Sequence, residues 1–361
     1  MSRRKPGSRL GWLALGALFA WAFTTGLGLW IWATLPGPGS GAPLVVDWPE
    51  NLDARSSADR LAGLGLIKSP RWFALYLRLV GATPEPGPHL LNDRLSPREL
   101  VQRLARLKTR PALRVTVPEG YNQFQIADRL EKLGICSSAS FRRAVSDRRL
   151  LDELGIRGPS AEGWLFPASY DFALDSAPAQ VIRGMVREMQ KRLERLDRDN
   201  AGALARLERE KGMTRNDVLT LASIVEREAS HPDERKTIAS VFFNRLEDPT
   251  FLPARTLQSD PTAGYGCLVE PERIPSCTGF DGRISPALLR DPANRWNTYR
   301  HPGLPPGPIA NPGEAAISAV LAPARTEYLF FVARGDGRHT FSRTFAEHTS
   351  AVEQSGPAPK P

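Results

Sequence analysis

The 361-residue sequence predicts an α+β protein with three successive parts: an N-terminal transmembrane helix, a small α/β module and a larger mixed α+β domain. Three observations predict this class. Residues 10–35 carry no charge, several later segments repeat apolar residues at helical spacing, and short segments typical of strands separate those helices. The length is sufficient for two soluble domains and an anchor.

The N-terminal uncharged run is long enough to cross a bilayer, since about 20 apolar residues span the hydrocarbon core. Arg3, Arg4 and Lys5 precede it. Because basic residues stay in the cytoplasm, we expect residues 1–9 to be a cytoplasmic basic tail, residues 10–35 a single transmembrane helix, and the remainder extracytoplasmic. A cleaved signal peptide is the alternative, but the run is longer than a typical signal core and no clear small-x-small site follows.

The formal net charge of +9 is compatible with nucleic acid, an anionic membrane or an acidic polymer as partner. The sequence contains no zinc finger, RNA-recognition signature or dense basic-aromatic stripe, so we expect no nucleic-acid partner. No histidine stands at zinc spacing from Cys267 and Cys277, and we expect neither a metal nor another cofactor. In an exported chain these two cysteines could instead form a disulfide, which their spacing alone does not establish.

A proline- and glycine-rich linker is predicted at residues 36–43, before a small module at 44–160. Ser96 and Glu99 have the spacing of a capping box at the start of a helix. The module's predicted elements are a strand at 44–46, helices at 57–66 and 70–80, a loop at 83–88, a helix at 96–107, a strand at 113–117, and helices at 121–133 and 140–154. Small units of this order resemble wall-binding LysM modules, and a spacer without binding function is the alternative.

The larger domain is predicted over residues 161–350, followed by a disordered tail at 351–361. Its first residues place Trp164 among three aromatics around a glycine and a proline. Such aromatic faces stack on sugar rings, or on one another in a cluster that joins domains. The domain's predicted elements are helices at 178–211, 218–230, 233–246 and 314–321, and strands at 328–333 and 339–341 joined by a hairpin turn.

Two carboxylates follow the apolar run of the helix at 218–230. Glu228 lies three and four residues after Val225 and Ile224, so it borders the buried stripe, whereas Glu226 lies further around the helix. A carboxyl group at such a border is partly desolvated, which raises its pKa and lets it hold a proton near neutrality, as a general acid must. A surface cluster of charges that closes the helix is the alternative.

Polar residues downstream could line a groove beside this helix. Gln258 and Asp260 lie two apart in a segment that we predict to be extended, so both could face one side. Asn297 and Tyr299 follow, and then a stretch at 303–313 so rich in proline and glycine that it predicts a rigid loop.

Six blocks in order resemble the YceG-like family of endolytic murein transglycosylases. The blocks are LASIVEREA (221–229), FFNRL (242–246), LQSDPT (257–262), NTY (297–299), GLPPGPI (303–309) and HTF (339–341), and EGWLFP (162–167) agrees as well. The resemblance covers roughly residues 44–350 and implies a YceG-like catalytic domain at 161–350. It also implies an enzyme of the inner membrane that cuts the MurNAc–GlcNAc bond within nascent glycan strands without water, leaves 1,6-anhydro ends and so limits strand elongation.

The resemblance implies that Glu228 is the catalytic residue, and its partners would be peptidoglycan glycan strands, the inner membrane and peptidoglycan synthases. The matching blocks offer these candidates for substrate binding: Gln258, Asp260, Asn297, Tyr299, Glu226 and Trp164. Two features depart from the family. The usual Gly-x-Tyr element of the N-terminal module is replaced by GPHLL at 87–91, and residues 267–277 resemble an insertion.

Two other functions remain open on the sequence. The chain could be a wall-binding scaffold without activity, although a scaffold would not need an acid at Glu228. It could also be a hydrolytic muramidase in which Asp260 is the second carboxylate beside Glu228.

Overall fold

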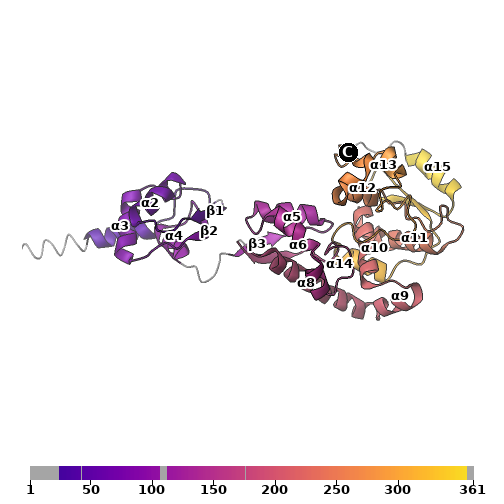
Figure 1. The fold of residues 1–361 in the computed structure, drawn as a ribbon, viewed down its shortest axis with the longest axis horizontal. Coiled ribbons are helices and arrows are strands. Elements are labelled where there is room, and N and C mark those ends of the chain that lie inside the picture. Colours follow the sequence, from indigo (N-terminus) through magenta and orange to yellow (C-terminus); the bar gives the residue numbers. More distant parts are fainter. Residues whose placement is uncertain (1–23, 42, 106–111, 175, 356–361) are drawn as a thin grey trace, which may run out of the picture. The chain divides into compact units, whose positions relative to one another are not determined.

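The computed structural model describes residues 24–41, 43–105, 112–174 and 176–355. The protein is a mixture of helices and short antiparallel strands and divides into two compact units (Figure 1). The first unit ends at Ala112 and also takes in 173–175, and the second comprises Leu113–Phe172 and the chain from Ser176 onward. We expected the boundary at residue 160, but β3 (Ala112–Thr116) pairs with β4 (Ser169–Ala173), which ties the intervening helices to the second unit.

In the first unit, a two-stranded sheet packs with the helices α2, α3 and α4. Its strands pair antiparallel with Val46 opposite His89. The elements are β1 (Pro43–Trp48), α2 (Ala54–Gly63), α3 (Pro70–Val80), β2 (Gly87–Asn92) and α4 (Pro97–Leu104). The predicted capping box of Ser96 and Glu99 is present at the start of α4. We expected a loop up to residue 88, but β2 begins at Gly87, because a strand at a sheet edge tolerates a proline.

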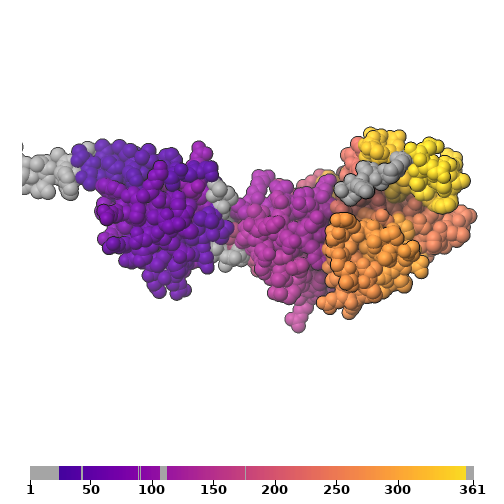
Figure 2. Space-filling view, turned by 90° about the horizontal axis from the view of Figure 1, so that it is seen from above, coloured from indigo at the N-terminus to yellow at the C-terminus, as the bar shows by residue number. Residues whose placement is uncertain are grey.

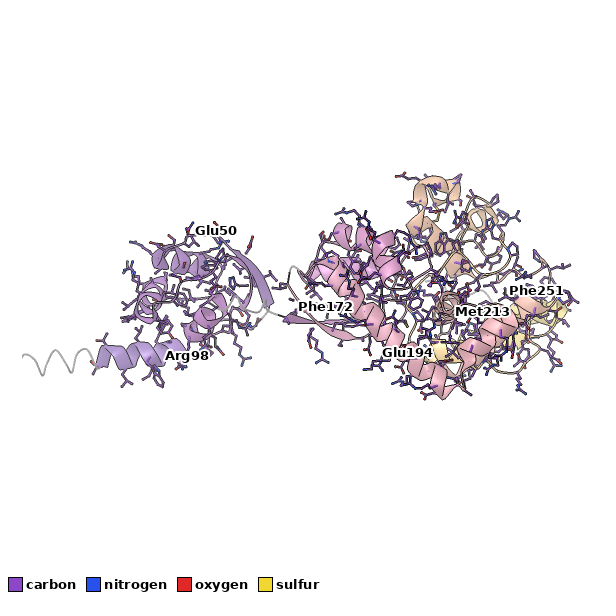
Figure 3. All side chains as sticks on the ribbon, turned by 60° about the horizontal axis from the view of Figure 1, so that its bottom comes forward. Glu50, Arg98, Phe172, Glu194, Met213 and Phe251 are labelled. Atoms are coloured by element: carbon purple, nitrogen blue, oxygen red, sulfur yellow. A yellow bond between two sulfur atoms is a disulfide. The ribbon has the colours of Figure 1, made fainter. Side chains whose placement is uncertain are left out.

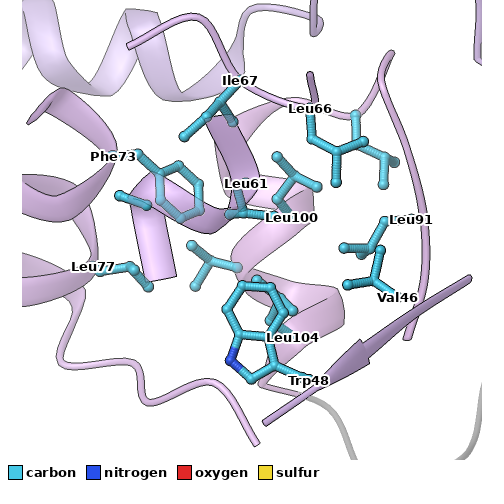
Figure 4. Close-up of a cluster of buried hydrophobic side chains, with 13 residues drawn as sticks. Val46, Trp48, Leu61, Leu66, Ile67, Phe73, Leu77, Leu91, Leu100 and Leu104 are labelled. Carbon is cyan, nitrogen blue, oxygen red and sulfur yellow. The ribbon is translucent and has the colours of Figure 1, made fainter. Parts of the chain in front are cut away.

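The core of the first unit is continuous and apolar. Trp48, Phe73 and Leu77 are almost fully buried and pack with leucines of α2 and α4 (Figure 4). The segment expected to be a linker is bound to this unit, since the N–H groups of Gly37 and Gly39 donate to the carbonyls of Arg94 and Asp93 at 3.0 and 2.9 Å. Residues 36–41 are therefore part of the folded unit.

The first part of the predicted transmembrane segment, residues 10–23, lies outside the described residues. Residues 24–34 are helical, and the Trp32 ring meets Tyr76 edge-on with centroids 6.4 Å apart. Among the helices that the structure describes, none is both long and apolar enough to cross a membrane.

The second unit begins with helices that support the rest. Each of two long predicted helices is divided in two, at Asp147, which caps α7, and at Gly202, whose φ of +68° favours glycine. Figure 3 labels Glu194 on α8 and Met213 just after α9. The elements are α5 (Gln123–Lys132), α6 (Ser138–Val145), α7 (Arg148–Glu153), α8 (Pro178–Asp199) and α9 (Ala203–Lys211).

At the centre of the second unit, α10 packs against α11 and α14 (Figure 1). Thr214 caps α10 in a capping box with Asp217. The elements are α10 (Arg215–Glu228), η1 (Pro232–Glu234), α11 (Arg235–Glu247), α12 (Asp260–Val269), η2 (Pro271–Arg273), η3 (Pro275–Cys277), α13 (Pro286–Arg290), α14 (Glu314–Leu321), the antiparallel pair β5 (Phe330–Ala333) and β6 (His339–Ser342), and α15 (Phe345–Ser355).

Two expectations about the end of the domain have clear outcomes. Cys267 and Cys277 form a disulfide, with Cα atoms 5.2 Å apart. The tail does not begin at residue 351, because α15 continues to Ser355. His348 stacks on Phe330 with ring centroids 5.2 Å apart, and Ala351 is buried.

A buried carboxyl group joins the loops around the site. Glu162 accepts hydrogen bonds from the Gln123 N–H (2.8 Å), the Tyr265 hydroxyl (2.8 Å) and the Asn311 amide (2.6 Å). Burial raises its pKa to about 7, against the effect of these donors. The EGWLFP segment, the start of α5, α12 and the rigid loop at 303–313 therefore meet at one point. Gly163 (φ +81°) makes this meeting possible, because an added Cβ would lie 2.3 Å from Pro308.

Candidate active site

Glu228 is the last residue of α10, and its carboxyl group is half-buried. The apolar stripe of α10, including Leu221 and Val225, is completely buried and fixes the direction of the helix end. The Ser259 hydroxyl donates to Glu228 Oε1 at 2.5 Å. Burial raises the pKa of Glu228, the bond from Ser259 opposes this, and the neighbouring Asp260 carboxylate adds to the rise. A carboxyl group so placed retains a proton at higher pH than a solvated glutamate.

The loop that carries Ser259 is held by the NTY block. The N–H groups of Gln258 and Ser259 donate to the Thr298 carbonyl (3.2 Å) and hydroxyl (3.0 Å). The Thr262 hydroxyl donates to the Ser259 carbonyl at 2.6 Å and contacts the Thr298 hydroxyl at 2.9 Å. Two segments far apart in the sequence thus form one clamp beside Glu228.

The prediction that the segment containing Gln258 and Asp260 is extended is wrong. Gln258 has a φ of +53°, and its amide donates to Thr256 at 3.3 Å, while Asp260 opens α12. The two side chains therefore do not share one face of a strand. Asp260 instead accepts a hydrogen bond from the Tyr299 hydroxyl at 2.7 Å. Burial, followed by the Asp260 charge, raises the pKa of Tyr299, which keeps its hydroxyl protonated.

Asn297 is completely buried. Its amide donates to the carbonyls of Leu288, Leu289 and Asp291 at 3.2, 2.9 and 3.4 Å, and its oxygen accepts from the Tyr299 N–H at 3.0 Å. The polar atoms of the Asn297 side chain are thus all hydrogen-bonded within the protein, and they hold the backbone of Tyr299 in place.

Glu226 and Trp164 lie outside the cluster around Glu228. Glu226 pairs with Arg235 at 3.3 Å and accepts from the Gly313 N–H at 3.1 Å, with its side chain 7% exposed. Trp164 is buried, and its indole N–H donates to Asn216 at 3.1 Å in the first turn of α10. At a rise of about 1.5 Å per residue, that turn is about 18 Å along the axis from Glu228.

Arg245, a buried arginine beside the site, was not predicted from the sequence as a functional residue. Arg245 donates through Nε to the Leu329 carbonyl at 2.6 Å and through Nη1 to the Leu257 carbonyl, so it fixes the loop that leads to Ser259. Its guanidinium lies over the rings of Phe251 (labelled in Figure 3), Phe330 and Phe331, with the carbon 5.0, 5.8 and 5.7 Å from their centroids. Burial lowers its pKa to about 10, while Tyr299 and Glu228 act in the opposite direction.

The pair of His339 and Glu234 was not predicted from the sequence either. His339 Nδ1 lies 2.8 Å from Glu234 Oε2, and its backbone N–H donates to Oε1 at 3.0 Å. Positive charge on His339 and Arg245 lowers the pKa of Glu228 and so opposes the effect of burial. Arg245 lies in the FFNRL block and His339 in the HTF block, and an ionisable residue two positions from a phenylalanine was the signal available in the sequence.

The geometry supports acid–base chemistry by one carboxyl group. Glu228 is held by a hydroxyl donor, partly shielded from water and close enough to the Arg245 guanidinium for that charge to stabilise its ionised form. Asp260, the neighbouring carboxylate, is exposed and engaged by Tyr299. Glu228 can therefore donate a proton and later accept one while it stays hydrogen-bonded to the Ser259 hydroxyl.

Comparison with known proteins places this geometry in context. The model of the YceG-like family matches residues 46–354. A Bacillus subtilis (strain 168) protein named endolytic murein transglycosylase is 29% identical over 326 residues, which cover 84% of this chain and 83% of that protein. A Streptococcus pneumoniae (strain D39) protein of the same name is 27% identical over 344 residues, which cover 85% of this chain and 59% of that protein.

A solved structure agrees with the fold. The crystal structure of a yceG-like protein from Listeria monocytogenes matches with a TM-score of 0.54 and 28% sequence identity. The match covers 86% of this chain and 99% of that chain.

Asn297→Ala should destabilise the protein, whereas Tyr299→Phe should not. The alanine leaves buried carbonyl groups without a donor, which costs about 3 kcal/mol, while the phenylalanine loses one partly exposed hydrogen bond worth about 1 kcal/mol or less. Urea unfolding of both variants measures the difference. Equal stability of the two variants would contradict the supporting role of Asn297.

Proposed function

The chain belongs to the YceG-like family, and from this premise we propose that it is an endolytic murein transglycosylase, a lyase that acts on peptidoglycan. Its substrate is the glycan strand, which it cleaves internally at the MurNAc–GlcNAc bond. The observation that supports this most directly is the half-buried Glu228 carboxyl group, held by the Ser259 hydroxyl at 2.5 Å.

Glu228 acts first as a general acid. Its raised pKa maintains the protonated form, which donates a proton to the glycosidic oxygen as the bond to the muramic anomeric carbon breaks. The leaving GlcNAc receives that proton on its hydroxyl group, and positive charge develops on the anomeric carbon.

The same carboxylate then acts as a base. The 6-hydroxyl of the muramic acid attacks its own anomeric carbon, a new C–O bond closes the 1,6-anhydro ring, and Glu228 accepts the hydroxyl proton. One carboxyl group completes the cycle and no water is consumed. The Arg245 guanidinium stabilises the carboxylate between the two steps.

The second candidate function is hydrolysis of the glycan strand, with Asp260 as the second carboxylate. Its proximity to Glu228 favours this reading, since it contributes to the raised pKa of Glu228. Against it, Asp260 is exposed and bound to the Tyr299 hydroxyl. Such a hydrogen bond suits a group that orients sugar hydroxyls.

The setting of the enzyme is also part of the proposal. The uncharged run at 10–35 behind a basic tail supports a single-pass anchor in the inner membrane, with both folded units outside the cytoplasm. The strand–helix–helix–strand order of the first unit supports a LysM-like role in wall binding. Action on nascent strands would bring the protein near peptidoglycan synthases and limit strand elongation.

Glu228→Gln should reduce cleavage of purified glycan strands by about 100- to 10,000-fold, because the amide can neither donate nor accept the proton. Mass spectrometry of the strand ends from the wild-type protein should show 1,6-anhydro-MurNAc. Glu353→Gln, a matched change at an exposed site on α15, should leave the rate unchanged. Reducing ends would indicate the hydrolase, absence of cleavage the scaffold, and an unaffected Glu228→Gln rate would remove Glu228 from the mechanism.

Ser259→Ala should move the alkaline limb of the pH–rate profile to higher pH. The hydroxyl stabilises the ionised carboxylate and lowers its pKa, so its removal raises that pKa and preserves the acid form as pH rises. The rate at the optimum should fall about tenfold, because the carboxyl group loses its orienting donor. A limb that moves toward lower pH would contradict the assignment of Glu228 as the acid.

A further inference from the structure

A groove of about 390 Å³ opens beside the site within the second unit. Asp260 belongs both to this groove and to the cluster around Glu228, so the two are continuous. One side is formed by Gly120, Asn122 and Arg227, and the other by α12 and the segment after the disulfide. Figure 2 shows the surface where the magenta part of the chain that contains α5 meets the orange part that contains α12.

The second side is apolar and firmly held. Phe280 and Ile284 pack on a small buried core that contains both cysteines of the disulfide. Gly264 lets the segment after the disulfide approach α12 closely, because an added Cβ would lie 2.9 Å from Ile284 Cδ1 and 3.5 Å from the Phe280 ring. The segment that resembled an insertion therefore supports one side of the groove.

Arg227 is the charged group of the groove that has no partner in the described part of the chain. It is exposed, and the structure gives its guanidinium neither a hydrogen bond nor an ion pair. The other polar groups are engaged: Asn122 and Gln125 cap α5, and Asp260 accepts from Tyr299. The groove thus contains an unpartnered cation together with apolar side chains, and an arginine is suited to binding a carboxylate with two parallel hydrogen bonds.

We propose that this groove is a subsite for the peptide stem of peptidoglycan, in which Arg227 binds a stem carboxylate and Phe280 and Ile284 contact alanine methyl groups. The stem is linked through the lactyl group of the same muramic acid whose bond Glu228 cleaves. A groove that begins at Asp260 is therefore adjacent to the point where the stem leaves the sugar. This inference rests on the proposed function, and it makes stem-bearing strands the preferred substrate.

The test compares full-chain protein on glycan strands that bear stems and on strands stripped of them by an amidase. The wild-type protein should show a kcat/KM about tenfold higher on stem-bearing strands. Arg227→Gln should bring the ratio of the two values close to one, mainly through KM, because a ground-state contact is lost. Arg227→Lys should restore part of the ratio, and Arg273→Gln, an exposed arginine outside the groove, should leave it unchanged.

Equal kcat/KM for the two substrates in the wild-type protein would overturn the inference, as would an equal loss on both in Arg227→Gln. A binding measurement separates this inference from the proposed function. Glu228→Gln protein should bind a MurNAc-tripeptide at least about tenfold tighter than MurNAc, and Arg227→Gln added to it should abolish the difference. If that difference is found while the wild-type protein forms no anhydro ends, the subsite stands and the transglycosylase function fails. If anhydro ends form but the two ligands bind equally, the subsite alone fails.

Discussion

The hydrogen bond from Ser259 to Glu228 is the interaction on which the site depends, because it joins a rigid helix to a loop without regular structure. The helix end is fixed by the buried stripe of α10, and the loop is fixed by Thr298 and by the guanidinium of Arg245. Since each side is held independently, the carboxyl group is positioned before substrate arrives, which reduces the reorganisation needed for catalysis.

Opposing influences set the protonation of this carboxyl group. Burial and Asp260 favour the acid, while Ser259, His339 and Arg245 favour the carboxylate. The proposed mechanism, in which one group donates and then accepts a proton, requires such a compromise, because strong stabilisation of either form would slow one of the two steps. Arg245 can be buried as a cation beside the site because three phenylalanine rings and two backbone carbonyls replace the water that would otherwise solvate its guanidinium.

The sequence was sufficient to place Glu228 and to predict most regular elements. Helical periodicity identified Glu228 at the edge of the α10 stripe, and helices such as that at 314–321 appear with the expected ends. Periodicity does not describe loops, so it missed Ser259 and gave Gln258 an extended conformation that its positive φ excludes. Asn297 was a candidate for substrate contact because it is polar, but polarity alone does not distinguish a buried support from an exposed ligand. Arg245 was missed because two of the three rings that stabilise the cation, Phe330 and Phe331, are distant in the sequence.

Direct titration of the Glu228 carboxyl carbon by NMR tests the central claim, that this group is a partly desolvated acid. The protein carries a selective ¹³C label in glutamate, and comparison with the Glu228→Gln spectrum identifies the resonance. We predict a midpoint above 4.5, the ordinary value for glutamate, because burial outweighs the Ser259 donor and the Arg245 charge. A midpoint at or below that value would show that the group holds its proton no better than a solvated glutamate, and the claim of a partly desolvated acid would be wrong.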